Sequence, residues 1–179
     1  MGRWFVGVGS STSMPHNKQN MTTPIPNEVV AALTDPQILT ITLYGETRGE
    51  AIEGQIAVGC VIRNRVETGR WGASYSKVCL APWQFSCWIP QGGRENYELV
   101  MSTAKHIATS TSLPDDALLR QCAWISQGII GGWIRDNTKD STHYYAPAAM
   151  KPAGSVPKWA VGKIPTAKVG RQLFFSGVK

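Results

Sequence analysis

Residues 51–67 carry the pattern that most restricts how this chain can fold. Apolar side chains recur at helical spacing, and further apolar residues widen the stripe on both sides. An apolar surface this wide belongs to a helix that is buried on most sides. Gly54 and Gly59 lie inside the pattern, and each costs about 1 kcal/mol relative to alanine. We therefore predict a buried helix here, with another backbone packed closely against the two glycines.

Three more segments have helical periodicity. The Asp-Pro pair at 35–36 predicts a helix start, with Asp as N-cap and Pro in the first helical position, for a helix that ends near Glu46. Residues 94–110 predict a third helix. A fourth is expected to begin at the capping signature in residues 112–115 and to end at the Gly-Gly pair at 131–132.

The rest of the chain is less regular. Residues 68–93 are expected to be an irregular loop rich in aromatic residues, with three tryptophans, and long loops of this kind are often functional. Beyond the fourth helix, prolines and glycines separate short strand-like pieces. These pieces are THYYA at 142–146, KWAV at 158–161 and RQLFF at 171–175.

Length and composition fit one globular domain. The chain has 179 residues, of which 42% are hydrophobic and 17% charged. Residues 1–24 are expected to be a flexible leader and residues 25–179 the folded domain. The apolar run near the start, in MGRWFVGVGSS, is too short for a signal peptide or a membrane helix. We expect a monomer.

The positive charge is concentrated at the C-terminal end. The net charge is +6, and residues 151–179 hold Lys151, Lys158, Lys163, Lys168, Arg171 and Lys179 but no acidic residue. Such a segment favours a polyanionic partner, although it can also be merely a soluble tail. Because apolar and proline residues separate the lysines, an anionic cell envelope fits better than nucleic acid. We predict that aromatic residues of the segment anchor it onto the helices.

The cysteines and histidines do not suggest a metal site. Cys60, Cys79, Cys87 and Cys122 form no CxxC pair, and the three histidines form no HExxH motif. A zinc amidase or endopeptidase is therefore a poor interpretation, and we expect neither a metal nor a cofactor. Free buried thiols are the default for Cys60 and Cys122, whereas pairing of Cys79 with Cys87 stays open.

Glu46 is the candidate general acid. At the carboxyl end of a helix the macrodipole disfavours the ionised carboxylate, and partial burial behind Tyr44 and Trp side chains acts in the same direction. Both effects raise the pKa of a carboxyl group toward neutrality, as a general acid requires. From spacing alone, a surface glutamate at a fraying helix end is the commoner explanation.

The stretch LYGETRGEAIEGQIAVGCVIRNRV, residues 43–66, resembles the cell wall hydrolase family typified by spore cortex-lytic enzymes. Weaker similarity continues through WQFS at 83–86, YYAP at 144–147 and the closing KWAVGKIPTAKVGRQLFF. The resemblance implies an α+β, mainly helical, lysozyme-like domain with a small antiparallel sheet near the cleft. Thr47 replaces the usual Ala, and Ala146 stands where Asn often precedes Pro.

The resemblance also implies site residues. It maps the family's catalytic glutamate onto Glu46, and it implies that the substrate contacts are Glu50, Gln84, Phe85, Ser86, Tyr144 and Tyr145. For Glu50, a structural charge at the start of the next helix is an equally good explanation. We expect only one of the two tyrosines to face the site. Asn64 and Arg65 are expected to secure their helix against the loop.

The implied activity is that of a lytic transglycosylase. Such an enzyme cleaves the bond between N-acetylmuramic acid and N-acetylglucosamine (MurNAc–GlcNAc) in peptidoglycan and leaves 1,6-anhydro-muramic ends. The alternatives are a hydrolysing muramidase with a second carboxylate and a non-catalytic wall-binding module. Without a signal peptide, a wall-degrading enzyme made in the host cytoplasm would reach the periplasm as phage endolysins do, by holin-type release.

Overall fold

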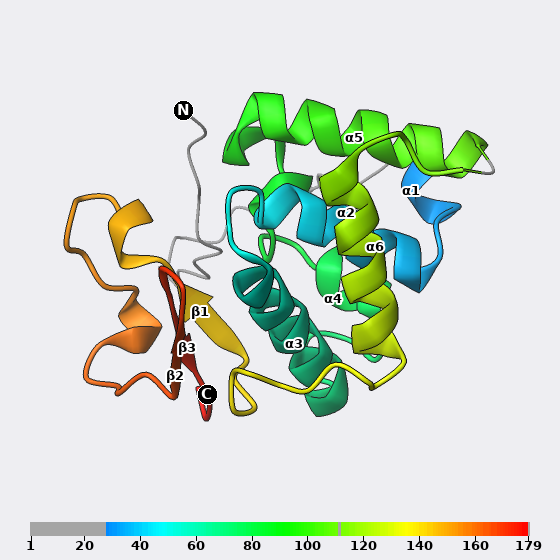
Figure 1. Ribbon diagram of the computed structural model, residues 1–179. Helices are drawn as coiled ribbons and strands as arrows, with labels where there is room; N and C mark the ends of the chain where they lie inside the picture. The colour runs from blue at the N-terminus through cyan, green and yellow to red at the C-terminus, as the bar shows by residue number, and fades with distance from the viewer. Residues whose placement is uncertain (1–27, 111, 179) are drawn as a thin grey trace, which may run out of the picture.

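The computed structural model describes residues 28–110 and 112–178, so the predicted leader at 1–24 lies outside the described residues. Figure 1 shows the helices gathered in one body, with the strands at its side. The α-helices are α1 Glu28–Ala31, α2 Asp35–Glu46, α3 Ile52–Thr68, α4 Tyr75–Cys79, α5 Arg94–Thr109 and α6 Ala117–Ile130. No helix of this part of the chain is long and apolar enough to cross a membrane.

Helix α2 is the most enclosed helix, because α4, α5 and α6 all pack against it. Every residue from 38 to 46 is buried. Its N-cap is Thr34 and not the predicted Asp35: the Thr34 amide donates to Oε1 of Gln37 at 2.8 Å. The Asp35 carboxylate accepts hydrogen bonds from the amides of Tyr75 (3.1 Å) and Ser76 (3.0 Å), so it joins α2 to α4 instead.

Helix α3 confirms the predicted buried helix, and Gly69 ends it with a left-handed φ of 69°. The explanation for its glycines was wrong, because side chains and not another backbone approach them. A Cβ atom at Gly54 would lie 3.3 Å from Cβ of Glu50, and one at Gly59 would lie 3.1 Å from Cγ1 of Ile129. The second contact lets α3 pack against α6.

Helix α5 matches the expected range, whereas the cap predicted for α6, Ser112, was four residues early. The cap is Asp116, whose Oδ1 accepts a hydrogen bond from the Leu119 amide at 2.9 Å. The segment 68–93 was also less irregular than predicted. It contains α4 and two short 3-10 helices, η1 Ser86–Trp88 and η2 Pro90–Gly92.

A three-stranded antiparallel sheet lies beside α3, away from α5 and α6 (Figure 1). Its strands are β1 His143–Tyr145, β2 Ala167–Val169 and β3 Gln172–Phe175, in the order β1-β3-β2. Two predicted strands are therefore present. The piece at 158–161 is instead a 3-10 helix, η4 Lys158–Ala160, because its apolar residues do not alternate along an extended chain.

Side chains on the two faces of the sheet belong to different clusters. Phe174 packs with Ala57 and Val61 of α3, and this contact fixes the sheet on the helical body. Phe175 faces the other way and packs with Tyr145 and Trp159. The predicted anchoring of the basic segment onto the helices therefore applies to Phe174, whereas Trp159 and Phe175 belong to a cluster outside the helical core.

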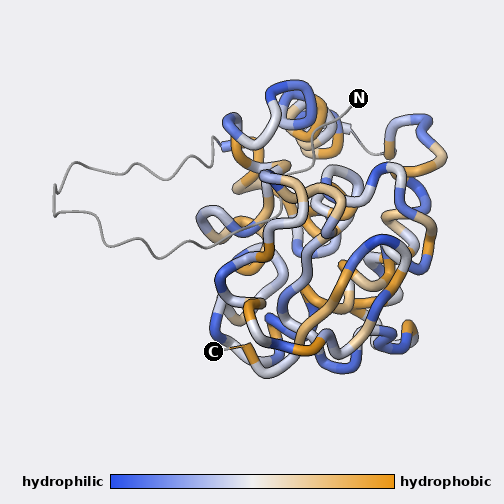
Figure 2. The backbone as a smooth tube through the Cα atoms, turned by 90° about the vertical axis from the view of Figure 1, so that its left-hand side faces the viewer, coloured by the Kyte–Doolittle hydropathy of each residue, from blue (hydrophilic) through white to orange (hydrophobic). Residues whose placement is uncertain are grey.

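The main core lies between the helices. In Figure 2 the hydrophobic stretches run through the body of the domain, and hydrophilic stretches gather at its turns. The four cysteines are buried and free, so the open question about Cys79 and Cys87 is answered against a disulfide. Burial raises the pKa of the Cys79 thiol to about 12 and that of Cys60 to about 11. They are neutral packing groups.

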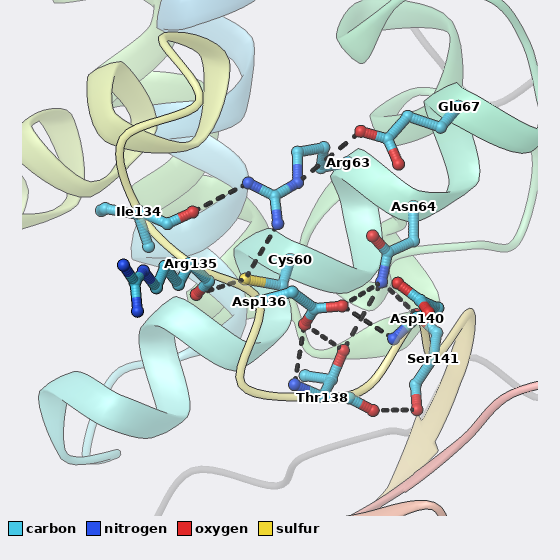
Figure 3. Close-up of polar contacts among 10 residues, drawn as sticks. All are labelled: Cys60, Arg63, Asn64, Glu67, Ile134, Arg135, Asp136, Thr138, Asp140 and Ser141. Atoms are coloured by element: carbon cyan, nitrogen blue, oxygen red, sulfur yellow. Dashed lines mark hydrogen bonds and ion pairs between the residues drawn. The ribbon is translucent and has the colours of Figure 1, made fainter.

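A polar clamp joins α3 to the chain that leads into β1 (Figure 3). Nδ2 of Asn64 donates to Oδ2 of Asp136 at 3.1 Å and to the Ser141 carbonyl at 3.0 Å. Asp136 in turn accepts hydrogen bonds from the amides of Thr138 and Asp140, both at 2.7 Å. Asn64 therefore secures its helix, but against residues 136–141 and not against the loop at 68–93 as expected. The clamp sets where β1 begins, and hence where Tyr144 lies.

Candidate active site

Glu46 is the last residue of α2, and its side chain is only 8% exposed. Its Oε1 accepts two hydrogen bonds from η1. One comes from the Cys87 amide at 2.8 Å and the other from the Ser86 hydroxyl at 3.1 Å. A carboxylate in this position is held in one orientation by a backbone donor and a side-chain donor.

Gly45 lets α2 approach η1 closely enough for these hydrogen bonds. A Cβ atom at this position would lie 2.6 Å from Cβ of Cys87 and 2.8 Å from Cγ2 of Val100. Both distances are far below a normal contact, and neither neighbour is a long flexible side chain. The carbonyl of Gly45 also accepts a hydrogen bond from Nδ2 of Asn96 at 3.0 Å. Gly45 thus places the end of α2 between η1 and α5.

The pKa of Glu46 is raised above its ordinary value. Burial is the largest cause, and the hydrogen bonds from Cys87 and Ser86 act in the opposite direction because they stabilise the ionised form. The predicted direction is therefore confirmed, but Tyr44 has another role. Its hydroxyl donates to Oδ2 of Asp116 at 2.8 Å, which ties α2 to the start of α6.

Residues 84–86 have three different roles beside Glu46. Ser86 contacts Glu46 directly. Oε1 of Gln84 accepts a hydrogen bond from Nη1 of Arg65 at 3.1 Å, which leaves its amide NH2 group to point elsewhere. Phe85 is 1% exposed, and its ring lies 5.5 Å from the Arg65 guanidinium. In this arrangement the Phe85 ring is a core residue beneath the site, and it presents no face to a sugar.

The two tyrosines of β1 point in opposite directions, as alternation along a strand requires. Tyr144 stacks on Phe174, with ring centroids 5.7 Å apart, and lies close enough to Glu46 for the carboxylate charge to act on its phenol. Burial and the Glu46 carboxylate raise the pKa of its phenol well above the usual value. Tyr145 is 6% exposed and lies in the cluster outside the helical core, with Trp159 and Phe175. The structure thus brings only Tyr144 toward Glu46.

Glu50 lies in the turn between α2 and α3, where an ion pair holds it. Its Oε1 accepts a hydrogen bond from Nη2 of Arg171 at 2.7 Å, and the same nitrogen donates to the Gly49 carbonyl at 3.1 Å. This contact connects the turn that follows Glu46 to the β2–β3 hairpin. A structural role of Glu50 is therefore supported by its ion pair with Arg171. A contact between Glu50 and the substrate stays a prediction.

Sequence reasoning missed two features of the site. The Cys87 amide is a backbone donor, and side-chain patterns carry no signal for it. Arg65 was assigned only to securing its helix, yet it lies near both Glu46 and Tyr144. No cluster of three or more possible metal-ligating residues occurs within residues 28–110 and 112–178.

A family model described as Cell Wall Hydrolase matches residues 49–175. The chain belongs to the Cell Wall Hydrolase family. The match begins three residues after Glu46, so it covers Glu50, the residues of segment 84–86 and both tyrosines. The assignment of Glu46 therefore depends on the geometry described above.

Curated relatives of this cell wall hydrolase include spore cortex-lytic enzymes. The enzyme of Bacillus cereus is 28% identical over 168 residues, which make up 94% of this chain and 52% of that protein. The enzyme of Bacillus subtilis is 26% identical over 141 residues, 78% of this chain and 37% of that one. The chain therefore spans about half the length of the relatives it matches, or less.

Two solved structures have the same fold. The catalytic domain of the Bacillus cereus SleB protein superimposes with a TM-score of 0.53 at 25% identity and covers 88% of this chain. The catalytic domain of the germination-specific lytic transglycosylase SleB from Bacillus anthracis gives 0.54 at 23% identity and covers 85%. Both are matched over 100% of their own length. The expected mainly helical domain with a small antiparallel sheet is confirmed.

Proposed function

We propose that this domain cleaves the MurNAc–GlcNAc bond of peptidoglycan as a lytic transglycosylase, with Glu46 as the single acid and base. The observation that carries the proposal is the buried Glu46 carboxyl group at the end of α2, oriented by Cys87 and Ser86. Membership of the Cell Wall Hydrolase family supports cleavage of the cell wall, and the Bacillus anthracis protein of the same fold is named as a lytic transglycosylase.

The chemistry uses the two opposing influences on Glu46. Burial favours the protonated carboxyl, which gives its proton to the glycosidic oxygen as the bond from that oxygen to C1 of the muramic residue breaks. The hydrogen bonds from Cys87 and Ser86 favour the carboxylate that results. That carboxylate then accepts the proton of the muramic C6 hydroxyl, whose oxygen bonds to C1. No water is consumed, and Glu46 ends protonated.

We propose Gln84, Ser86 and Tyr144 as the substrate-binding residues that support this reaction. The amide NH2 of Gln84 and the oxygen of Ser86 each keep hydrogen-bonding capacity beyond the bonds described above. No hydrogen bond joins the Tyr144 hydroxyl to any residue within 28–110 and 112–178. Since the raised pKa keeps this phenol protonated, it can donate to a sugar near Glu46. Glu50 and Tyr145 stay weaker candidates, whereas the buried Phe85 supports the site from the core.

Purified peptidoglycan sacculi provide the first test. The protein is expected to release soluble muropeptides from them, and the Glu46→Gln variant is expected to release none above background. A non-catalytic wall-binding module would sediment with sacculi and release nothing in either form. That result would contradict the proposal that the domain is an enzyme.

The natural target is a separate question. Endolysin activity with holin-type release stays a prediction, while the relatives are named as spore cortex-lytic enzymes. Comparison of cortex peptidoglycan with vegetative sacculi from the same species distinguishes the two roles. Faster cleavage of vegetative walls supports an endolysin, and strong preference for cortex supports a role like that of the relatives.

The basic end is proposed to attract the domain to an anionic envelope. Its four lysines within the described residues, at 151, 158, 163 and 168, are exposed. Replacing all four with glutamine should slow lysis of whole walls chiefly at low salt, because exposed charges are screened beyond about 8–10 Å at physiological ionic strength. Cleavage of a short soluble glycan should hardly change.

A variant with four exposed cations outside the basic end neutralised is the matched control. The four positions are Lys77, Lys105, Arg135 and Lys139. If both variants and the wild type show the same salt dependence, the basic end has no special role. An equal loss on the soluble glycan would mean that the lysines belong to the cleft.

A further inference from the structure

Arg65 is a buried cation beside the proposed site. Its side chain is 5% exposed, its Nε donates to the Thr142 carbonyl at 2.7 Å, and its Nη1 donates to Oε1 of Gln84 at 3.1 Å. Within residues 28–110 and 112–178, no carboxylate oxygen lies within 4.0 Å of the guanidinium. The charge is hydrogen-bonded, but it has no ion-pair partner there.

A buried charge without an ion pair is strongly disfavoured unless other groups compensate. Two aromatic rings provide part of this compensation, because the guanidinium lies 5.1 Å from the centre of the Trp71 ring and 5.5 Å from that of the Phe85 ring. The remaining burial is still large enough to lower the pKa of Arg65 to about 10. Arg65 nevertheless stays protonated at neutral pH.

Four titratable groups face this charge: Tyr144 and His143 on β1, Cys79 on α4 and Glu46 on α2. Burial raises the pKa of both Tyr144 and Cys79, so these two are neutral at neutral pH. Cys87 on η1, which contacts Glu46, is neutral for the same reason. Burial lowers the pKa of the His143 imidazole to about 4, so this side chain is neutral at neutral pH too. Glu46 is therefore the member of this group whose ionisation can stabilise Arg65.

We propose that Arg65 is a positioning residue of the glycosidase site: it orients Gln84 through Nη1, and its charge favours the ionised form of Glu46. The interaction is reciprocal, since a carboxylate that stabilises the guanidinium is stabilised by it equally. This adds to the hydrogen bonds from Cys87 and Ser86, which are larger influences on Glu46.

The inference deepens the proposed function and rests on it. A single residue that first gives and then accepts a proton needs both forms at similar free energy. Burial shifts Glu46 toward the protonated form, and groups that favour the carboxylate act against this shift. A cation that touches neither Glu46 nor the C6 hydroxyl restores the balance without competing for the proton.

Three variants separate the two parts of the role. Arg65→Gln removes the charge, Arg65→Lys keeps the charge but loses the planar fork, and Gln84→Ala loses only the oriented amide. Because Glu46 must start protonated, activity falls at high pH as it ionises. We expect Arg65→Gln to move the midpoint of this fall in activity to higher pH by about half to one unit. Arg65→Lys and Gln84→Ala should lower kcat and leave this midpoint at its wild-type pH.

Titration of the Glu46 carboxyl carbon by ¹³C NMR, with the signal assigned through Glu46→Gln, tests the charge without any assay of activity. The pKa of Glu46 should rise in Arg65→Gln and stay at the wild-type value in Arg65→Lys. An unchanged pKa in folded Arg65→Gln, or a raised one in Arg65→Lys, overturns the proposal. If Arg65→Gln does not fold, the Arg65→Lys result decides. Lack of glycan cleavage by the wild type would reject the proposed function instead, and the titration would still apply.

Discussion

Glu46→Gln is expected to lower kcat on sacculi by at least about 100-fold, because general acid–base assistance is worth about 10²–10⁴-fold and one residue here performs both steps. Glutamine has the same shape, and its Oε1 can still accept hydrogen bonds from Cys87 and Ser86. The fold should therefore be kept. Rates of muropeptide release, measured on protein with a wild-type melting profile, give the result.

Stability provides an independent readout of the same variant. Since the folded-state pKa of Glu46 is raised above 4.5, the wild type keeps the full contribution of this group below that pH and loses it as pH rises through the folded-state pKa. Glu46→Gln has no such loss. The free energy of unfolding of the variant should equal or exceed that of the wild type at pH 8, and the difference should shrink toward pH 4.

Glu53→Gln is the matched control, since Glu53 lies in the first turn of α3 and is exposed. It should retain wild-type activity. If Glu46→Gln keeps more than about a tenth of the wild-type rate, well short of the expected factor, Glu46 is not the acid. Loss of activity in Glu50→Gln equal to that in Glu46→Gln would support a second carboxylate and the hydrolysing alternative.

Gly45→Ala is expected to have the largest effect on stability. The new Cβ would lie 2.6 Å from Cβ of Cys87 and 2.8 Å from Cγ2 of Val100, so η1 or α5 must move. Overpacking of this kind costs about 1–3 kcal/mol. Movement of η1 would also displace the two donors to Glu46. We expect a lower free energy of unfolding in urea, together with lower activity in the fraction that folds.

Gly54→Ala makes the matching comparison within α3. There the nearest atom is Cβ of Glu50 at 3.3 Å, a tight contact that only a small shift is needed to relieve, and alanine is favoured over glycine in a helix by about 1 kcal/mol. This variant should be as stable as the wild type or more so. Equal stability of Gly45→Ala and the wild type would show that the end of α2 is not held as tightly as the contacts indicate.

The sequence was sufficient for the elements that have strong periodicity. Helices α3 and α5 lie where their apolar patterns place them, and β1 and β3 coincide with aromatic strand-like pieces. Starts of helices were less certain, because several residues compete for the cap. Thr34 with Gln37 caps α2, which leaves Asp35 to bind α4. Local sequence cannot show which of two neighbouring caps has a tertiary partner.

The candidate site shows the same division. The position of Glu46 at a helix end followed from its helix, and the direction of its pKa shift followed from burial. The donor from the Cys87 backbone and the location of Arg65 depend on how η1 and α3 pack around α2, over sequence separations that no local pattern spans. The residues that tune Glu46 were therefore the ones that only the fold could place.

The mass of the muropeptides released from sacculi tests the central claim most directly. Closure of the C6 hydroxyl onto C1 gives 1,6-anhydro ends, which are lighter by one water than the products of hydrolysis. We predict that the wild type releases anhydro-muropeptides and that Glu46→Gln releases none. Hydrated muramic ends from the wild type, made in H₂¹⁸O with incorporation of the label, would contradict a reaction carried out by one glutamate without water.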